Sequence, residues 1–227
     1  MRHNSVFVSV AGLLGLFIGG ATSHGSAIPV PVPVANPSFE EQVLASGSLF
    51  FSPTPITGWT ATASGGSDRG LWHFVPIGQD GFNVAFVNSL DSLAQDLGHA
   101  IVPNATYTVE FLFGSNGTSS SGVVEFYAGG TVSNGVVTGG TFLDRVEVDR
   151  PFTNPYMVEH TLAWTSPLSG LPVGENLSIR LAYGSTGISV AMFDDIRISY
   201  VLVPEPVSGL ILPAGGMLLA NRRRRQI

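Results

Sequence analysis

The feature that most constrains the fold of this chain is an alternation of apolar and polar residues with a period of two. The alternation is clearest over residues 107–111 and 177–183, where aliphatic and aromatic side chains occupy every second position. Successive side chains of a strand point to opposite faces, so this spacing gives each strand one apolar and one polar face. Because the body shows no sustained helical period, we expect it to fold from β-strands.

Turn-forming residues separate the predicted strands, as at Asp80-Gly81 and Asn134-Gly135. Many short strands joined by glycine-rich turns in one domain predict an all-β fold, a two-sheet antiparallel β-sandwich of the jelly-roll type. The further candidate strands cover residues 36–41, 47–51, 56–62, 70–75, 82–88, 92–98, 123–127, 131–138, 141–148, 156–165 and 188–201.

The N-terminal end of the chain has the layout of a secretory signal peptide. Arg2 and His3 precede an apolar stretch over 6–21, and small residues follow it up to residue 27. We therefore predict a signal peptide over 1–27, with an uncleaved anchor as the alternative. A spacer rich in proline and valine follows over 28–35. The β-sandwich domain is predicted over 36–203.

The tail over 204–227 combines three features in a fixed order: a proline motif, an apolar run over 207–220 and four arginines. The run spans about 21 Å as a helix, short of the roughly 30 Å hydrocarbon core of a bilayer. The arginines can snorkel to the head groups, so we predict a short membrane-seeking helix. The motif and the arginines are Pro204, Glu205, Pro206, Arg222, Arg223, Arg224 and Arg225.

This order resembles the PEP-CTERM sorting signal of exported bacterial proteins. The resemblance implies a transient partner, an exosortase-type membrane transpeptidase that recognises the tail and removes it. It also implies a destination in the cell envelope, at the cell surface or outside the cell, with the protein first held to the membrane by its C-terminus. A permanent short anchor is the alternative.

The composition of the body excludes some partners. Five arginines stand against fifteen acidic residues between 28 and 203, and the chain has no lysine. Nucleic-acid binding requires a basic surface, so we exclude it. Cysteine is absent, so no disulfide stabilises the exported domain, and a bound cation is a possible substitute.

A succession of short motifs resembles the galactose-binding-like jelly rolls of carbohydrate-binding modules. It begins at residues 36–40 (Asn-Pro-Ser-Phe-Glu) and ends at 192–198 (Met-Phe-Asp-Asp-Ile-Arg-Ile), with 56–59, 81–88, 93–97 and 105–111 between them. The resemblance implies a sandwich of eight to ten strands that often holds a structural calcium ion and often binds glycans.

Asp194 is the leading metal-ligand candidate. Alternation over 190–200 places this carboxyl in an apolar file of the last strand, where burial is costly unless the group is paired or coordinated. Calcium takes carboxylate and backbone oxygens, and Glu40 and Asp195 are the other predicted ligands. The alternative is that Asp194 and Asp195 accept backbone N–H bonds at a bulge or a strand end.

The candidate ligand-binding residues are Trp72, His73, Asp68 and Arg69, because an exposed indole ring is a common platform for sugars. Trp59 is expected in the core instead. The sequence shows no nucleophile motif and no metal-ligand spacing among its histidines. We therefore predict a non-enzymatic adhesion protein that contacts polysaccharide. The alternatives are a carboxylate-dependent enzyme acting on envelope polysaccharide, for which a related cyclase-type sandwich is a precedent, and a purely structural matrix component.

Overall fold

The computed structural model describes residues 27–45, 49–51, 56–62, 69–73, 80–88, 91–116, 120–150, 157–187 and 190–204. These residues form strands, turns and bends, and they include no helix that is long and apolar enough to cross a membrane. Residues 1–26 of the predicted signal peptide, Asp68 and the tail from Glu205 onward lie outside them.

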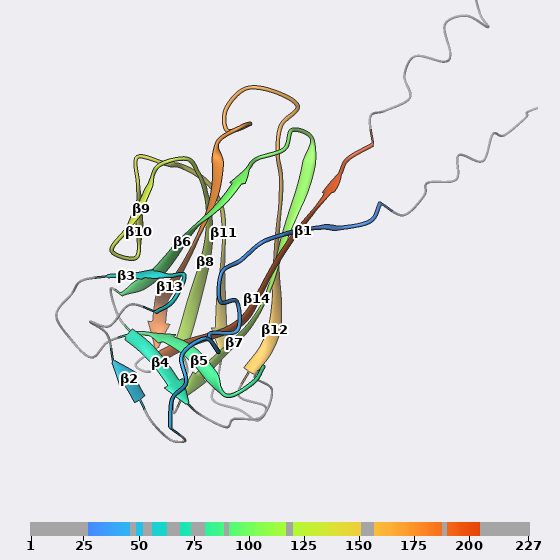
Figure 1. The fold of residues 1–227 in the computed structure, drawn as a ribbon. Coiled ribbons are helices and arrows are strands. Elements are labelled where there is room, and N and C mark those ends of the chain that lie inside the picture. The colour runs from blue at the N-terminus through green and yellow to red at the C-terminus, as the bar shows by residue number, and fades with distance from the viewer. Residues whose placement is uncertain are drawn as a thin grey trace, which may run out of the picture.

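Two antiparallel sheets face each other, which confirms the predicted all-β sandwich (Figure 1). Within the described ranges, the larger sheet contains β1 (Val30–Val32), β2 (Leu49–Phe51), β4 (Arg69–His73), β5 (Asn83–Val87), β7 (Ala105–Asn116), β12 (Met157–Thr165) and β14 (Val190–Leu202). The smaller sheet contains β3 (Thr60–Ala61), β6 (Ser92–Ala100), β8 (Ser120–Ala128), β11 (Thr141–Arg150) and β13 (Asn176–Gly187), and β9 (Thr131–Ser133) pairs with β10 (Val136–Thr138) as a separate hairpin.

The strand order of the larger sheet is β12-β7-β14-β5-β4-β2, and that of the smaller sheet is β11-β8-β13-β6-β3. The long strand β14 pairs with β7 on one side. On its other side it pairs first with β5 and then, near its end, with β1. The first and last strands of the described chain therefore lie side by side.

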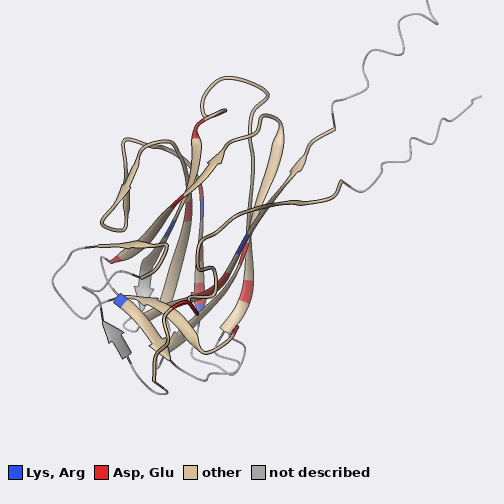
Figure 2. Cartoon of the chain, viewed as in Figure 1, with Lys and Arg blue, Asp and Glu red and all other residues tan. Residues whose placement is uncertain are grey.

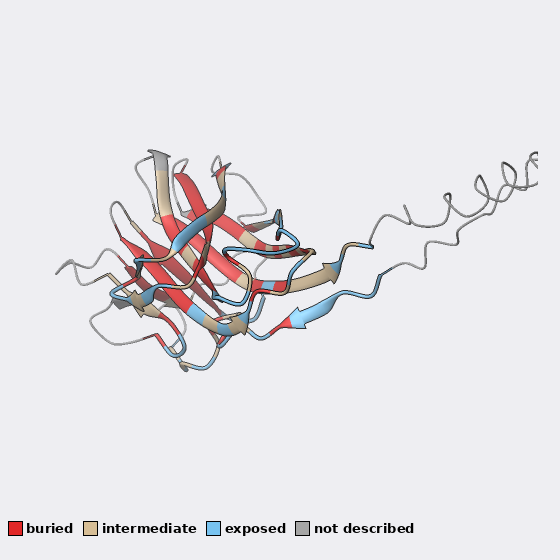
Figure 3. Cartoon of the chain, turned by 90° about the horizontal axis from the view of Figure 1, so that it is seen from above, coloured by how far each residue is buried: buried red, intermediate tan, exposed pale blue. Residues whose placement is uncertain are grey.

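The alternation seen in the sequence fills the space between the sheets. In β7, Tyr107, Val109 and Phe111 are fully buried, whereas Thr108 and Glu110 between them are half-buried on the other face. In β13, Leu177 and Ile179 are buried in the same core. Figure 3 shows the buried segments of both sheets gathered in the interior.

A β-bulge in β14 changes which residues face this core. The register shifts between Asp194 and Arg197, and Asp195 has a φ of 47°. Before the bulge, the odd-numbered Phe193 packs in the core between the sheets; after it, the even-numbered Ile196 does.

Asp194 consequently lies on the opposite face of the sheet from the one predicted. Its neighbour two residues earlier, Met192, belongs to a smaller apolar cluster with Val84, Phe86 and Met157. Simple alternation could not reveal this change of face, because one extra residue in a bulge reverses it. Asp194 is nevertheless fully buried.

Two N-terminal segments also differ from their predictions. Within the predicted spacer, Val30–Val32 forms β1 and pairs with Ile198 to Tyr200. The predicted strand over 36–41 is wrong, since this segment forms turns. Asn36 and Phe39 have φ angles of 48° and 58°, which a strand does not accommodate.

Candidate functional site

Three segments that are distant in sequence meet beside β14, between its pairing with β5 and its pairing with β1: the turn after β1, the residues leading into β5 and the bulge of β14. The carbonyl of Pro37 accepts the N–H of Ile196 at 3.0 Å. The backbone N–H of Asp80 donates to Asp194 Oδ2 at 2.7 Å. Ser38 Oγ donates to Asp80 Oδ2 at 2.8 Å. Both the turn and the bulge therefore hold the segment over 80–83.

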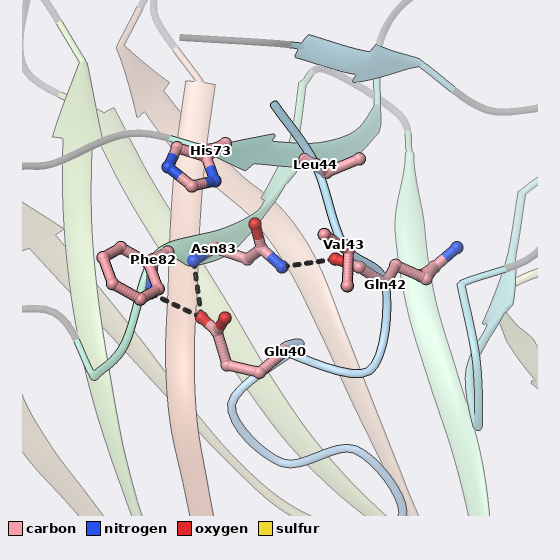
Figure 4. A pocket seen from close by; sticks show the side chains of 7 residues that line it. All are labelled: Glu40, Gln42, Val43, Leu44, His73, Phe82 and Asn83. Carbon is pink, nitrogen blue, oxygen red and sulfur yellow. Dashed lines mark hydrogen bonds between the residues drawn. The ribbon is translucent and has the colours of Figure 1, made fainter. Parts of the chain in front are cut away.

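Glu40 holds the same segment from the side of the turn. Its Oε1 accepts the backbone N–H groups of Phe82 at 2.7 Å and Asn83 at 2.5 Å (Figure 4). Gly81 has a φ of +72°, and a Cβ there would lie 2.6 Å from Glu40 Oε1. Glycine at this position is therefore what allows the carboxylate to approach the backbone.

A small cavity of about 130 Å³, which we call the Glu40 pocket, opens beside this carboxylate. The His73 and Phe82 rings stack with centroids 5.5 Å apart and planes 7° apart. A cavity of similar size accommodates one benzene ring. Its lining residues are Glu40, Gln42, Val43, Leu44, His73, Phe82 and Asn83. A wider depression adjoins it, lined by Asn36, Pro37, Ser38, Glu40, Glu41, Asp80 and Gly81.

Asn83 offers this pocket a free hydrogen-bond acceptor. Its amide N–H groups donate to the carbonyls of Phe39 at 3.0 Å and Gln42 at 2.8 Å, which fixes the orientation of the side chain. Its Oδ1 is buried and has no partner within the described residues. Figure 4 shows this oxygen directed toward the space between His73 and Leu44. A buried acceptor without a partner is costly, so a ligand N–H or O–H there would be favoured.

Asp194 is the buried acid of the site. Its pKa is raised to about 8, chiefly by burial and in smaller part by the negative charges of Asp80 and Asp195, while two backbone N–H bonds oppose the rise. Asp194 is therefore mostly protonated at neutral pH. Its two oxygens accept the backbone N–H groups of Asp80 and Asp195.

The described residues contain no group of three or more His, Asp or Glu side chains that could hold a metal ion. Glu40 bonds to the backbone of 82 and 83, and Asp194 bonds to that of 80 and 195. These contacts match the second interpretation of Asp194, a carboxyl that accepts backbone N–H groups at a bulge. The side chains of the described residues do not by themselves form a calcium site, and calcium binding stays a prediction.

Of the predicted binding residues that the structure describes, His73 lines this pocket, whereas Arg69 and Trp72 do not. Arg69 is buried, and its Nη1 lies 3.7 Å from Asp91 Oδ1, which indicates a structural ion pair. Trp72 is half-buried and packs against the smaller apolar cluster. Trp59 lies in the core as expected and donates its indole N–H to the carbonyl of Asn36.

The prediction from sequence overlooked Phe82 and Asn83, which line the Glu40 pocket, and Asp80, whose backbone N–H donates to Asp194. A signal for them was present, since Asp80-Gly81 is a turn motif and binding residues are often found on loops. The missing information was which distant segment packs against that turn.

The family model described as HpiC1-like, HpiC1 cyclase, matches residues 30–199 of the chain. No curated protein matches the sequence of this chain. Structures of the same fold include the Stig cyclase Fisc from Fischerella sp. TAU bound to (3Z)-3-(1-methyl-2-pyrrolidinylidene)-3H-indole. It is 19% identical, covers 78% of this chain and 100% of its own, and has a TM-score of 0.63. A cyclase from the same source bound to 4-(1H-indol-3-yl)butan-2-one is 20% identical, covers 77% and 99%, and has a TM-score of 0.62.

The matched family is one of enzymes, so the predictions of a non-enzymatic adhesion protein and of no catalytic activity are wrong. The reason for the error is physical. A β-sandwich supports both binding and catalysis, and the difference lies in a few side chains brought together by the fold, not in strand patterns.

Proposed function

The chain belongs to the HpiC1-like cyclase family, and from this we propose that it is an enzyme that closes a ring in a small, mostly apolar organic molecule. The observation that carries the proposal is the position of Asp194. This buried acid keeps its proton at neutral pH and lies one hydrogen bond from the segment that lines the pocket. The whole site falls within the range that matches the family.

Asp194 is the proposed proton donor. Its O–H bond breaks as a C–H bond forms at a substrate double bond, and a carbocation results. A nucleophilic ring carbon of the substrate attacks the cation and forms the new C–C bond. That carbon then returns its proton to the Asp194 carboxylate, so the net reaction is an isomerisation. Because Asp194 is covered in this structure, donation requires that the Asp80–Gly81 backbone move aside.

Glu40 is suited to stabilise the positive charge. Two backbone N–H bonds fix its carboxylate at the wall of the pocket before any substrate binds, so little reorganisation is needed when the charge develops. The stacked rings of His73 and Phe82 present an aromatic surface to the same space, which also favours a cation.

An aromatic substrate with an N–H group, such as an indole, fits the pocket best. One ring can occupy the cavity beside Phe82, and its N–H can donate to Asn83 Oδ1, which lacks a partner within the described residues. The two Fischerella cyclases named above were crystallised with indole-containing ligands, which supports the same substrate class.

The test uses 3-(4-methylpent-3-enyl)-1H-indole, whose protonation and closure give a ring-closed isomer of equal mass. Conversion is followed by chromatography and by loss of the vinyl proton in NMR spectra. We expect conversion by the wild-type chain, none by Asp194→Asn, and unchanged conversion by Asp96→Asn, a control at an exposed carboxylate. The function is contradicted if the wild type neither converts this compound nor binds 4-(1H-indol-3-yl)butan-2-one in calorimetry, or if Asp194→Asn retains full activity.

We also propose that the protein is exported and sorted by its tail, on the strength of the Pro204-to-Arg225 pattern in the sequence. Fractionation of cells that express the full chain tests this. Replacement of Arg222–Arg225 by glutamine should shift the protein out of the envelope fraction. An unchanged distribution would remove the tail from the proposal and leave the enzymatic function untouched.

A further inference from the structure

The end of the sandwich from which both described termini leave carries almost no charge. Four segments, residues 27–35, 97–107, 164–174 and 198–204, contain no Asp, Glu, Lys or Arg. This is unusual in a body with fifteen acidic residues. Figure 2 shows most of the charged residues elsewhere, and the ends of β1 and β14 that lead to the termini are tan. The exposed Glu175 follows the third segment, and its backbone carbonyl accepts the N–H of Ile101.

Hydrogen bonds join these four segments into one surface, which we call the terminal face. Val30 pairs with Tyr200, which joins the first segment to the last. The backbone N–H of Asn104 donates to the carbonyl of Pro167 at 3.0 Å, and the N–H of Val203 donates to the carbonyl of Asn104 at 2.8 Å. Asn104 thus connects the other two segments to the end of β14.

The terminal face exposes large apolar side chains. Ile28, Leu168, Leu171 and Leu202 are 85%, 67%, 76% and 57% exposed. A single exposed aliphatic side chain needs no explanation, but four on one face with little charge indicate a surface that binds a partner. Trp164 and Tyr200 lie half-buried behind them against Tyr107, with ring centroids 5.9 and 5.4 Å from its ring.

We propose that the terminal face rests on a lipid bilayer. The apolar run of the tail begins at Val207, and three residues of extended chain from Pro204 reach at most about 10 Å. If that run enters a membrane, as the proposed sorting role requires, the end of β14 must lie at the head groups. Exposed aliphatic side chains with tryptophan and tyrosine at their border are typical of surfaces at that depth.

The proposed orientation leaves the Glu40 pocket facing away from the lipid. Asp194 precedes Leu202 by eight residues on β14, a separation of roughly 26 Å along a strand. The acidic body would also be repelled by anionic head groups, so the terminal face should prefer zwitterionic lipid.

Fluorescence quenching by phosphatidylcholine brominated in its acyl chains tests the proposal on the full chain. One variant keeps Trp164 alone (Trp59→Phe, Trp72→Phe), and a matched variant keeps Trp72 alone (Trp59→Phe, Trp164→Phe). On zwitterionic vesicles we expect at least twofold quenching of Trp164 and little quenching of Trp72, which lies on the far part of the sheet. Two results would overturn the proposal but leave the tail's role intact. One is equal quenching of Trp164 and Trp72, and the other is no quenching of Trp164 although the protein sediments with the vesicles.

A second comparison keeps all tryptophans. The triple variant Leu168→Ser, Leu171→Ser, Leu202→Ser should lose at least half of the vesicle-bound fraction. The control variant Val43→Ser, Phe142→Ser, which removes exposed apolar side chains elsewhere, should not. Equal losses in both variants would contradict a specific terminal face. A wild-type chain that stays in solution would overturn both this face and the membrane role of the tail.

Discussion

At the scale of single residues, the most consequential feature is a carboxyl group that burial keeps neutral. Asp194 has the two N–H partners that would suit an anion, yet desolvation outweighs them and raises its pKa to about 8. The protein therefore holds a protonated acid at neutral pH, one hydrogen bond from the segment over 80–83. The bulge at Asp195 creates this environment by turning Asp194 away from the main core.

The raised pKa predicts how stability depends on pH. The folded state keeps the Asp194 proton up to about pH 8, whereas the unfolded chain releases it near pH 4, the usual value for aspartate. The contribution of Asp194 is thus fully present below pH 4 and is lost as pH rises toward 8. Asp194→Asn removes this contribution, so the fall in Tm between pH 5 and pH 8 should be smaller in the variant. An identical slope in both proteins would show that Asp194 titrates normally.

The same Tm measurements test whether the predicted calcium ion is bound. A cation at Asp194 would hold the carboxylate ionised and abolish the pH dependence just described. With the neutral acid, the wild-type Tm at pH 7 should be the same in EDTA and in millimolar calcium. A rise of several degrees with calcium, absent in Glu40→Gln, would instead support the metal site and would argue against Asp194 as the acid.

Gly81 supplies a separate test of how Glu40 is held. Gly81→Ala introduces a Cβ that would contact the Glu40 carboxylate, at a φ that side chains disfavour. We expect a loss of about 2–4 kcal/mol in the free energy of unfolding. Gly98→Ala is the control, because Gly98 also has a positive φ but faces open space, so it should lose only about 1 kcal/mol. Urea titrations of the two variants measure the difference.

At the scale of elements, one buried ion pair joins the two sheets. Arg69 lies in β4 of the larger sheet, and Asp91 immediately precedes β6 of the smaller one. Removal of one partner leaves a buried charge without compensation, so Arg69→Leu should cost about 3–5 kcal/mol. Arg145→Leu breaks the exposed pair with Glu147 and should cost less than about 1 kcal/mol. Comparable losses, measured by urea unfolding, would contradict a special role for the cross-sheet pair.

Strand positions followed from the sequence because local alternation specifies them, as in β7 and β13. Positions that depend on an irregular backbone could not be predicted from the sequence in this way. The turn over 36–41 depends on left-handed φ angles at two non-glycine residues, and the face of Asp194 depends on a bulge. β1 was missed because alternating proline and valine also suits an extended spacer.

At the scale of the whole molecule, the candidate site residues gather beside the bulge of β14, where the turn after β1 meets the residues leading into β5. The sequence identified Glu40, His73 and Asp194 as separate candidates for a metal site and a sugar platform. The fold instead gathers them around the segment over 80–83, which carries the acceptor Asn83 and the aromatic ring of Phe82. A single sequence could not show this, because the contacts link residues 42 and 43 positions apart at Glu40 and 114 positions apart at Asp194.

The most direct test of the proposed chemistry is the protonation state of Asp194. We expect the infrared spectrum at pH 6.5 to contain a carboxylic-acid carbonyl band that Asp194→Asn lacks, and we expect this band to disappear with a midpoint near pH 8. A band that disappears near pH 4, or a spectrum that is unchanged in the variant, would contradict Asp194 as the acid that closes the ring.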